Sequence, residues 1–429
     1  MRQRKTALVI GGGIAGLAAA LELARHKISI RVLEANDRFG GRILTHHAGA
    51  TPIEMGAEFV HGKSRALLQA IRRAKLKTGP VPEKNRLFQN GRFSKVELWD
   101  IVGKTINRID PRQPDVSFEQ FLADQKIKEP ARTFARNFII GFDAADPTRA
   151  GAHALRLAEY SAEQMHLETG LRVARGYSAL VDDFVKKIKH PRAGHGGQLI
   201  LNTRVRHVEW KRGKVKVTAE QNNQLKIFHA DIAVIALPLG ILKTNVVKFT
   251  PSLPEKLEAI RGLEFGNVVK IIFQFKERTW DDFGFIQAFG EPIPTWWSDS
   301  RGPILIGWAG GPRADALRKH SQAKLESLGL GILRKILFPK MSPAALRQQF
   351  VASHYKDWAA DPLIRGAYSY IPVNGLDLPK LLAAPVADTL FFAGEATVKD
   401  AQTGTVFGAL ETGLRAAEEI LRNRKSPTL

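Results

Sequence analysis

A glycine-rich turn between an apolar strand and an alanine-rich helix constrains this chain more than any other feature of its 429 residues. Residues 5–10 (KTALVI) predict a short buried strand, and residues 17–26 predict a helix. Between them, residues 11–16 have the spacing GxGxxG. In this pattern the first glycine makes a tight turn, the second lets the backbone approach a pyrophosphate, and the third allows close packing of helix and strand. The pattern therefore predicts a Rossmann-like domain that binds a dinucleotide.

An acidic residue completes this unit. A second apolar run, at 28–33, ends at Glu34, which lies 18 residues after Gly16. An acid in this place can accept both ribose hydroxyls of an adenosine. The start of the preceding helix offers free N–H groups and the positive end of its dipole to a phosphate. The expected cofactor contacts of this unit are Gly11, Gly13, Ile14, Ala15, Gly16, Glu34 and Ala35.

An arginine-flanked glycine pair bears on the choice between NAD and FAD, which share this fingerprint. Residues 38–42 read RFGGR and follow shortly after Glu34. Paired glycines let the chain approach a second anionic segment, and a guanidinium neutralises phosphate charge. The stretch EANDRFGGRI at 34–43 resembles the second motif of the FAD-containing amine oxidases. The resemblance implies that the cofactor is FAD and that Gly41 and Arg42 contact it.

The same family resemblance continues along most of the chain. Residues 53–62 (IEMGAEFVHG) resemble the family's loop that passes the flavin, and residues 201–205 (LNTRV) resemble the segment whose backbone meets the adenine. The stretches FFAGEAT at 391–397 and GTVFGALETGLRAAEEIL at 404–421 resemble its C-terminal strand, turn and helix. The resemblance is weakest over about 80–175. It implies further FAD contacts at Gly56, Ala57, Glu58, Val205, Gly394, Glu395, Thr405 and Val406.

Secondary-structure patterns divide the chain into interleaved segments. Helical patterns at 117–126, 130–142 and 176–189 follow a hairpin signal at Asn90–Gly91, and strand patterns resume at 199–202. The expected fold class is α/β, with a Rossmann-like FAD-binding domain interleaved with an α+β substrate-binding domain. The expected segments are 1–78, 196–250 and 385–429 for the FAD-binding domain, and 79–195 (largely helical) and 251–384 for the substrate-binding domain.

A lysine in the middle of an apolar strand is the first candidate for chemistry at the flavin. Residues 266–275 read GNVVKIIFQF, and strand alternation places Lys270 on one face with Val268 and Ile272. A lysine in a strand often extends its charged end to water. The segment, however, resembles the amine-oxidase strand whose lysine holds a water against flavin N5. That resemblance implies a catalytic Lys270, for which we expect an apolar pocket.

An aromatic constellation is the second candidate. Residues 354–362 (HYKDWAADP) and 365–370 (RGAYSY) resemble the family's aromatic wall, with Trp358 beside the flavin and Tyr368 at the substrate amine. Aromatic faces attract or orient an amine nitrogen without adding a competing charge. The same rings would also serve as plain core packing. The resemblance implies that Trp358 and Tyr368 are catalytic.

Two positions depart from the animal monoamine oxidases of this family. Ala367 stands where those enzymes carry a flavin-linking cysteine, and Thr405 stands where they carry a second tyrosine. The chain thereby resembles polyamine oxidases and lysine-demethylase-type oxidases more, and we expect non-covalent FAD, although a histidyl link is chemically open. His61 falls where polyamine oxidases present a polar residue to the substrate, but a lone histidine also fits a loop. The expected substrate contacts are His61, Tyr368 and Thr405.

Composition limits the remaining possibilities. The absence of cysteine excludes disulfides, thiolate metal sites and a cofactor tethered through sulfur. The histidines lack metal-ligand spacing, so we expect no metal. Lys+Arg 64 less Asp+Glu 42 leaves a net charge of +22, but without an aromatic-interleaved basic cluster we expect no specific nucleic-acid partner. No apolar run reaches the length of a membrane span, and we expect a cytoplasmic protein. Nothing in the sequence indicates an oligomeric state.

Together with the resemblance, these residues predict an enzyme that oxidises a primary or secondary amine to an imine and then to an aldehyde. Hydride would pass to flavin N5, and O2 would be reduced to H2O2. One alternative is a flavin desaturase or oxidase of a non-amine substrate, such as a porphyrinogen or carotenoid, on the same fold. Another is a flavin-containing scaffold that binds an anionic partner through the basic surface.

Overall fold

A parallel β-sheet lies at the centre of the cofactor-binding half of the protein. The structure is a computed structural model that describes residues 5–49, 51–167, 170–190 and 196–422. The strands pair in parallel throughout this sheet, and they are buried on both faces, as their apolar sequences require. The predicted Rossmann-like α/β class is confirmed. The strand order is β10 (Gln198–Ile200), β2 (Ser29–Leu33), β1 (Thr6–Ile10), β14 (Ile232–Ile235) and β23 (Leu390–Phe392).

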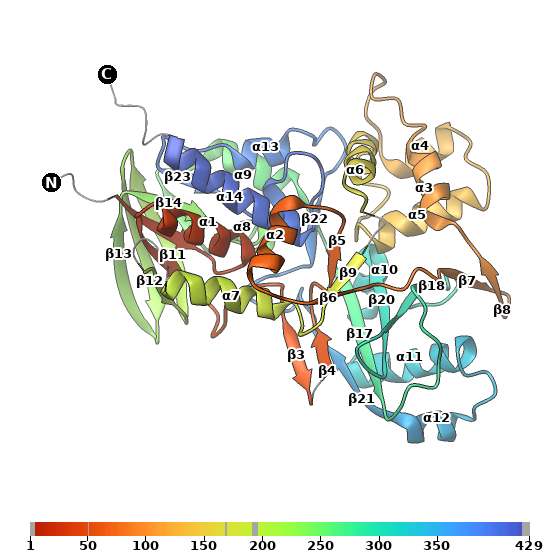
Figure 1. Ribbon diagram of the computed structural model, residues 1–429. Coiled ribbons are helices and arrows are strands. Elements are labelled where there is room, and N and C mark those ends of the chain that lie inside the picture. Colours follow the sequence, from red (N-terminus) through yellow and green to blue (C-terminus); the bar gives the residue numbers. More distant parts are fainter. Residues whose placement is uncertain (1–4, 50, 168–169, 191–195, 423–429) are drawn as a thin grey trace.

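Helices cover one face of this sheet and a β-meander covers the other (Figure 1). The helices are α1 (Ile14–Arg25), α7 (Ser178–Lys189) and α14 (Val406–Arg422), which share one apolar core with the sheet. The meander consists of β11 (Thr203–Lys211), β12 (Lys214–Gln221) and β13 (Gln224–Ala230), whose buried valines pack on the opposite face. Helix α7 packs against α1, although its sequence lies in the segment 79–195 that we expected in the substrate-binding domain.

A mixed sheet forms the framework of the other half of the protein. The predicted hairpin is present in it, because Asn90 and Gly91 take positive φ angles of 52° and 73° between β7 and β8. Helices cover the sheet face that carries Val269 and Phe273. The strand order is β21 (Phe350–Tyr355), β17 (Val268–Phe275), β20 (Ile304–Gly310), β19 (Thr295–Asp299), β18 (Phe285–Gln287), β7 (Arg86–Gln89) and β8 (Arg92–Lys95). The covering helices are α10 (Gly311–Leu317), α11 (Gln322–Ile336) and α12 (Pro343–Gln349).

A helical cluster lies beside the mixed sheet and builds its own apolar core (Figure 1). It consists of α3 (Leu98–Ile106), α4 (Phe118–Asp124), α5 (Ala131–Gly141) and α6 (Ala152–Met165). Shorter elements connect the two halves. They are β3 (Thr45–Ala48), β4 (Thr51–Glu54), β5 (Phe59–His61), α2 (Arg65–Arg73), β6 (Thr78–Pro80), β9 (Gly170–Val173), α8 (Leu239–Leu242), β15 (Lys248–Thr250), α9 (Pro254–Gly262), β16 (Glu264–Gly266), β22 (Tyr368–Tyr370), α13 (Leu378–Ala383) and a 3₁₀ turn at Glu395–Thr397.

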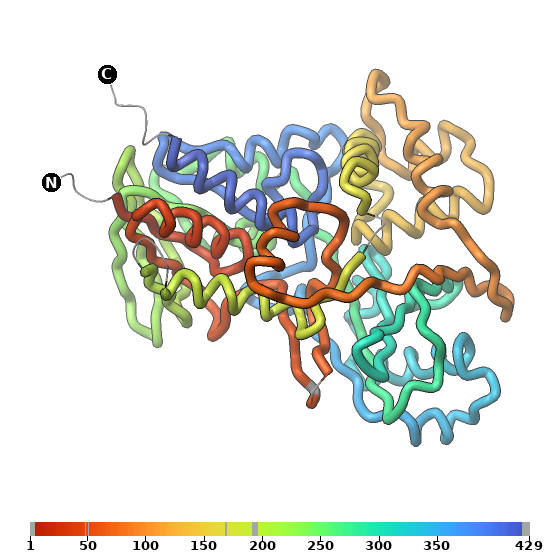
Figure 2. Tube along the Cα trace, in the orientation of Figure 1, coloured from red at the N-terminus to blue at the C-terminus, as the bar shows by residue number. Residues whose placement is uncertain are grey.

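The last helix of the chain lies along the first one. Figure 2 shows the C-terminal segment beside the N-terminal segment, and α14 packs against α1. The contact is close, because a Cβ added to Gly413 would lie 2.1 Å from the carbonyl oxygen of Ala15. The position of α1, and of the glycine turn that precedes it, therefore depends on the C-terminal helix.

Gly413→Ala should destabilise the protein, because the added methyl group forces α14 away from α1. Overpacking of this kind typically costs about 1–3 kcal/mol. The matched control is Gly331→Ala in α11, where an added Cβ meets nothing within 4 Å. That change should leave stability unchanged or raise it by up to about 1 kcal/mol. Thermal unfolding of both variants measures the difference, and an unchanged melting temperature in Gly413→Ala would contradict the tight contact.

Candidate active site

A continuous cavity of about 1080 Å³ is lined by the carboxyl ends of the parallel strands and by the mixed sheet. Ligands of open α/β sheets bind outside those strand ends, and the volume matches the upper end of the range of about 300–1,000 Å³ for ligand pockets. Lys270, Trp358 and Tyr368 line the same cavity as the glycine turn. With the exception of Gly16, so do all the other residues that we predicted for the site from the sequence.

The three glycines of the turn have the separate environments that the motif predicts. Gly11 has a φ of +106°, and a Cβ there would lie 2.5 Å from the carbonyl oxygen of Ala236. Gly16 lies beneath the turn, where a Cβ would lie 2.0 Å from the carbonyl oxygen of Gly11. Gly13 has open space, and no side chain caps the start of α1 behind it. The N–H groups of this helix start are therefore free to bind a phosphate.

Glu34 directly follows β2 and lies beside the glycine turn. Its carboxylate accepts hydrogen bonds from the backbone N–H groups of Gly12 (2.6 Å) and Asn36 (2.8 Å). Burial raises the pKa of this carboxyl group, and these hydrogen bonds oppose that shift. The side chain is held at the cavity wall, where an adenosine ribose would lie if a dinucleotide's phosphates bound at the turn. These features fit FAD.

Arg42 and Glu395 brace the cavity wall from opposite ends of the chain. Arg42 donates to Glu395 over 3.0 Å. The other carboxylate oxygen of Glu395 accepts from the hydroxyl of Ser369 (2.6 Å) and the backbone N–H of Gly404 (3.0 Å). Both of its oxygens are thus engaged by the protein. Glu395 thereby joins the segments that carry Arg42, Ser369 and Gly404 at the cavity wall.

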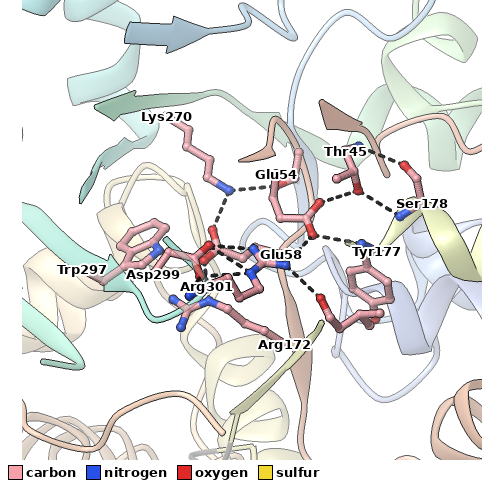
Figure 3. A network of polar contacts seen from close by, with 12 residues as sticks. Thr45, Glu54, Glu58, Arg172, Tyr177, Ser178, Lys270, Trp297, Asp299 and Arg301 are labelled. Carbon is pink, nitrogen blue, oxygen red and sulfur yellow. Dashed lines mark hydrogen bonds and ion pairs between the residues drawn. The ribbon is translucent and has the colours of Figure 1, made fainter. Parts of the chain in front are cut away.

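Lys270 projects from β17 into the cavity wall, and the predicted alternation of this strand is present. Its neighbours Val269 and Ile271 face the helices, whereas Ile272 packs on the opposite side. The surroundings of Lys270 are not apolar as we expected. Its ammonium donates to the carboxylate of Glu58 (2.7 Å) and to the carbonyl oxygen of Gly56 (3.2 Å), and the residue is only 4% exposed (Figure 3).

Glu58 is the centre of a buried polar network (Figure 3). Besides Lys270, it accepts from the guanidinium of Arg172 (2.7 Å) and the indole N–H of Trp297 (2.9 Å). Burial alone would raise the pKa of Glu58, but the charges of Lys270 and Arg172 outweigh it and lower the pKa to about 2. Glu58 is therefore ionised at any physiological pH.

A second layer of charges stands behind this network. Glu54 accepts from the hydroxyl of Thr45 (2.8 Å) and the backbone N–H of Tyr177 (2.9 Å), and it pairs with Arg301 at 3.3 Å (Figure 3). Arg301 also pairs with Asp299 at 2.7 Å. Burial raises the pKa of Glu54, and Arg301 opposes that shift. Sequence reasoning named Lys270 and Glu58 but missed the other residues of these two layers; charged residues inside buried runs were the available signal.

The predicted aromatic residues also line the cavity. The indole N–H of Trp358 donates to the carbonyl oxygen of Met55 (3.0 Å), which fixes the ring beside Gly56. The hydroxyl of Tyr368 donates to the carbonyl oxygen of Phe142 (2.7 Å). Burial raises the pKa of Tyr368, and the nearby charges of Asp143 and Glu395 add to the shift, so the phenol remains neutral.

Thr405 and His61 are the two other residues that we predicted to contact the substrate. Thr405 donates to the carbonyl oxygen of Gln402 (2.9 Å) and accepts from the backbone N–H of Gly408 (3.1 Å), so its hydroxyl serves the start of α14. His61 lies on β5. Burial lowers the pKa of its imidazole to about 4, against the opposing charge of Glu58, which leaves the ring neutral at physiological pH.

Charged side chains are unevenly distributed along the cavity. We call the part lined by residues 10–42, 203–206 and 392–406 the cofactor side, and the part lined by residues 80–171 and 268–308 the distal side. The arginines that line the cavity, among the described residues, are on the cofactor side: Arg38, Arg42, Arg204 and Arg206, beside the carboxylates Glu34 and Glu395. The distal side carries the carboxylates Glu83, Glu97, Asp143 and Glu159, with Lys270 as its one cation among the described residues.

Asp143 is the most perturbed of these distal carboxylates. It follows α5, and no hydrogen bond or ion pair joins its side chain to another residue that the structure describes. Burial, with a contribution from the charge of Glu159, raises the pKa of Asp143 to about 7. Among the described residues this carboxylate has no cationic partner, and it becomes fully charged only above neutral pH.

Two further searches cover the described part of the chain. None of its helices combines the length and the apolar character needed to cross a bilayer. Within the same residues, no group of His, Asp and Glu side chains is arranged to hold a metal ion.

Known proteins resemble this chain over nearly its whole length. A model of the family "flavin containing amine oxidoreductase" matches residues 14–421. Polyamine oxidase 2 of Arabidopsis thaliana is 31% identical over 96% of this chain and 87% of its own length. Polyamine oxidase 3 of Oryza sativa subsp. japonica is also 31% identical, over 96% of this chain and 88% of its own length.

Solved structures share the fold. Putrescine oxidase bound to putrescine superposes with a TM-score of 0.83 at 21% identity, covering 98% of this chain and 99% of that one. Cyclohexylamine oxidase from Brevibacterium oxydans gives a TM-score of 0.82 at 20% identity, covering 99% of this chain and 100% of that one. The family inferred from the sequence motifs is confirmed. The chain belongs to the flavin-containing amine oxidoreductases, enzymes that oxidise amines with FAD.

Proposed function

We propose that this enzyme oxidises an aliphatic amine that carries a second positive charge, such as a diamine or polyamine, with FAD bound non-covalently. The observation that carries this proposal is the uneven distribution of charge along the cavity. Arginines line the side suited to the FAD phosphates, and carboxylates outnumber cations on the distal side, where Asp143 and Glu159 act on each other through their like charges. In a chain of net charge +22, an acidic lining is selective for cations. The polyamine oxidases among its relatives agree in substrate class.

The chemistry of the oxidation belongs to the cofactor. When bound, FAD would supply the two-electron oxidation: the amine would lose a hydride from the carbon beside its nitrogen and a proton, which gives the imine, and O2 would be reduced to hydrogen peroxide. The imine then reacts with water to give an aldehyde and an amine or ammonia. The distal carboxylates favour an amine substrate over the porphyrinogen or carotenoid alternative. They would repel an acidic porphyrinogen, and a neutral carotenoid would offer them no partner.

The protein's own groups would bind and orient the amine. Trp358 and Tyr368 present ring faces that attract an amine nitrogen, and neutral His61 offers a hydrogen bond without a competing charge. Lys270 would hold a water at flavin N5 through the N–H that its two protein acceptors leave free. Thr405 would contact the substrate through its methyl group, because its hydroxyl is engaged in the helix start.

The remaining predicted residues would hold FAD. The start of α1 would bind the pyrophosphate, Glu34 the adenosine ribose, and Val205 the adenine. The segments around Gly56 and Gly394 would pass the flavin. Since the chain has no cysteine and Ala367 occupies the linking position, we propose that the flavin is held by these contacts alone.

Removing the distal charges should separate diamines from monoamines. The variant Asp143→Asn/Glu159→Gln should raise KM for a diamine about ten- to hundredfold, the loss expected for a charge-assisted contact of about 1.5–3 kcal/mol. KM for a monoamine of the same chain length should change little. Peroxide release from a panel of amines measures both. Glu119→Gln is the control, because Glu119 pairs with Arg132 and Arg136 and does not line the cavity.

The same measurement has a pH signature. Because the raised pKa of Asp143 lies near 7, its carboxylate forms as pH rises through that value, and KM for the diamine should fall over the same range. This fall should be absent in the double variant. Equal losses for monoamine and diamine, with no change in pH dependence, would contradict a second ammonium site at these carboxylates.

Glu34→Ala should weaken FAD binding far more than it changes the chemistry of enzyme that keeps its FAD. Loss of a charged acceptor for ribose hydroxyls typically costs about 1.5–3 kcal/mol, or about ten- to hundredfold in affinity. Flavin content after dialysis measures the effect. The wild type should release intact FAD into the supernatant on acid precipitation; flavin that stays with the polypeptide would show a covalent link. Unchanged flavin content in the variant would contradict the adenosine role of Glu34.

Lys270→Met should keep the fold and the FAD, because Glu58 retains Arg172 and Trp297 as partners and is not left unpaired. Flavin reduction, reoxidation or both should slow by about 10²–10⁴-fold, the usual contribution of a positioned proton-transfer group. Rapid mixing with the two half-reactions measured separately tests this. Wild-type rates in both would remove Lys270 from the reaction.

A further inference from the structure

One buried carboxylate controls where the Lys270 ammonium lies. Glu58 is held from three sides, because one of its oxygens accepts from Arg172 and Trp297 and the other accepts from Lys270 (Figure 3). The carboxylate, the guanidinium of Arg172 and the ammonium are all at least 95% buried. A carboxylate with this many donors has one orientation available. The ammonium that pairs with it is fixed in turn.

Lys270 needs such a fixed partner. A lysine side chain is a compact charge on a flexible four-carbon stem, and alone it would sample several positions along the wall. Its three N–H groups are donors only. Glu58 and the carbonyl oxygen of Gly56 take two of them, and Trp297 places its ring 5.9 Å from the nitrogen. The third N–H is left for the cavity that Lys270 lines.

Other charged groups surround the Lys270–Glu58 pair and act on it through their charges. Arg172 stands behind Glu58 on β9, and Glu54 on β4 interacts with Lys270 through its charge. Arg301, which pairs with Asp299 at the end of β19, acts on Glu58 through its charge. Neutral His61 on β5 adds no charge at physiological pH. Among the described residues, Glu58 is the only side chain that accepts a hydrogen bond from the Lys270 ammonium.

We propose that Glu58 is a positioning residue for the reaction: it holds the Lys270 ammonium at the cavity wall, with one N–H left for the cofactor side. This inference rests on the role proposed above for Lys270. An ammonium has N–H donors only, so the group that Lys270 offers to a water at the flavin is a donor. Glu58 thereby sets both the place and the direction of that hydrogen bond.

The test combines Glu58→Gln with Lys270→Met. Glutamine keeps the size and an acceptor oxygen for Lys270 but removes the charge. Glu58→Gln should slow the half-reaction that Lys270→Met slows, by about 10²-fold if the nitrogen moves by about 1 Å, and it should spare the other half-reaction. Glu58→Gln/Lys270→Met should be no slower than Lys270→Met alone, because a residue that acts through Lys270 has nothing left to position. Glu119→Gln is again the control for loss of a paired carboxylate.

Glu58→Asp gives a readout that a purely structural role would not move. Aspartate keeps the charge but has a shorter reach, so it should displace the ammonium without leaving it unpaired. It should therefore slow the half-reaction that Lys270→Met slows and spare the other one, while flavin content and melting temperature stay at their wild-type values.

The outcomes separate this inference from the proposed function. Wild-type rates in Glu58→Gln, or losses that multiply in the double variant, would overturn the positioning role while leaving the Lys270 role standing. Wild-type rates in Lys270→Met would overturn both roles, whereas peroxide release with amines would still support the oxidase. If neither Glu58→Gln nor Glu58→Asp folds with FAD, Glu58 is a structural residue and the inference is wrong.

Discussion

The cavity wall of this enzyme depends on one buried ion pair, between Lys270 and Glu58. Lys270 belongs to the mixed sheet, whereas Glu58 stands just before β5 in the loop that follows the β3–β4 hairpin. The same carboxylate binds Arg172 of β9 and Trp297 of β19. A buried carboxylate without donors is costly. Glu58 gains all three of its side-chain donors only when the strands that carry them are packed together. The wall therefore forms only when the two halves of the fold are assembled.

Charge is arranged along the cavity in the order that an anionic cofactor and a cationic substrate require. Arginines and the uncapped start of α1 are on the cofactor side, and carboxylates are on the distal side. The Lys270–Glu58 pair brings no net charge of its own. A basic chain of net charge +22 would repel a cationic amine in the bulk. The acidic distal lining would reverse that preference locally for the diamine proposed above.

Sequence patterns predicted what is local and missed what is distant. The glycine turn, β1, α1 and Glu34 form one contiguous unit, and its physical logic can be read from spacing alone. Gly16 illustrates the limit, because its role is to let the helix pack and it never reaches the cavity. Strand alternation placed Lys270 beside two apolar residues, but it could not show its partner Glu58, which lies 212 residues away along the chain. Arg172, Trp297 and Asp143 belong to no motif and acquire meaning only through tertiary contacts.

Stability alone is a poor explanation for the Glu58 cluster. Burying an ion pair removes both charges from water, and apolar replacements of similar size are often neutral or stabilising. Here three charged groups are removed from water together, those of Glu58, Arg172 and Lys270. In addition, one guanidinium nitrogen of Arg172 has no hydrogen-bond partner within the described residues. If this wall only had to close the cavity, an apolar side chain like those of Val268 and Ile272, which flank Lys270 on the same face of β17, would serve in its place. An ammonium fixed at the wall offers what those residues cannot: a hydrogen-bond donor of defined direction at the place where the flavin would react.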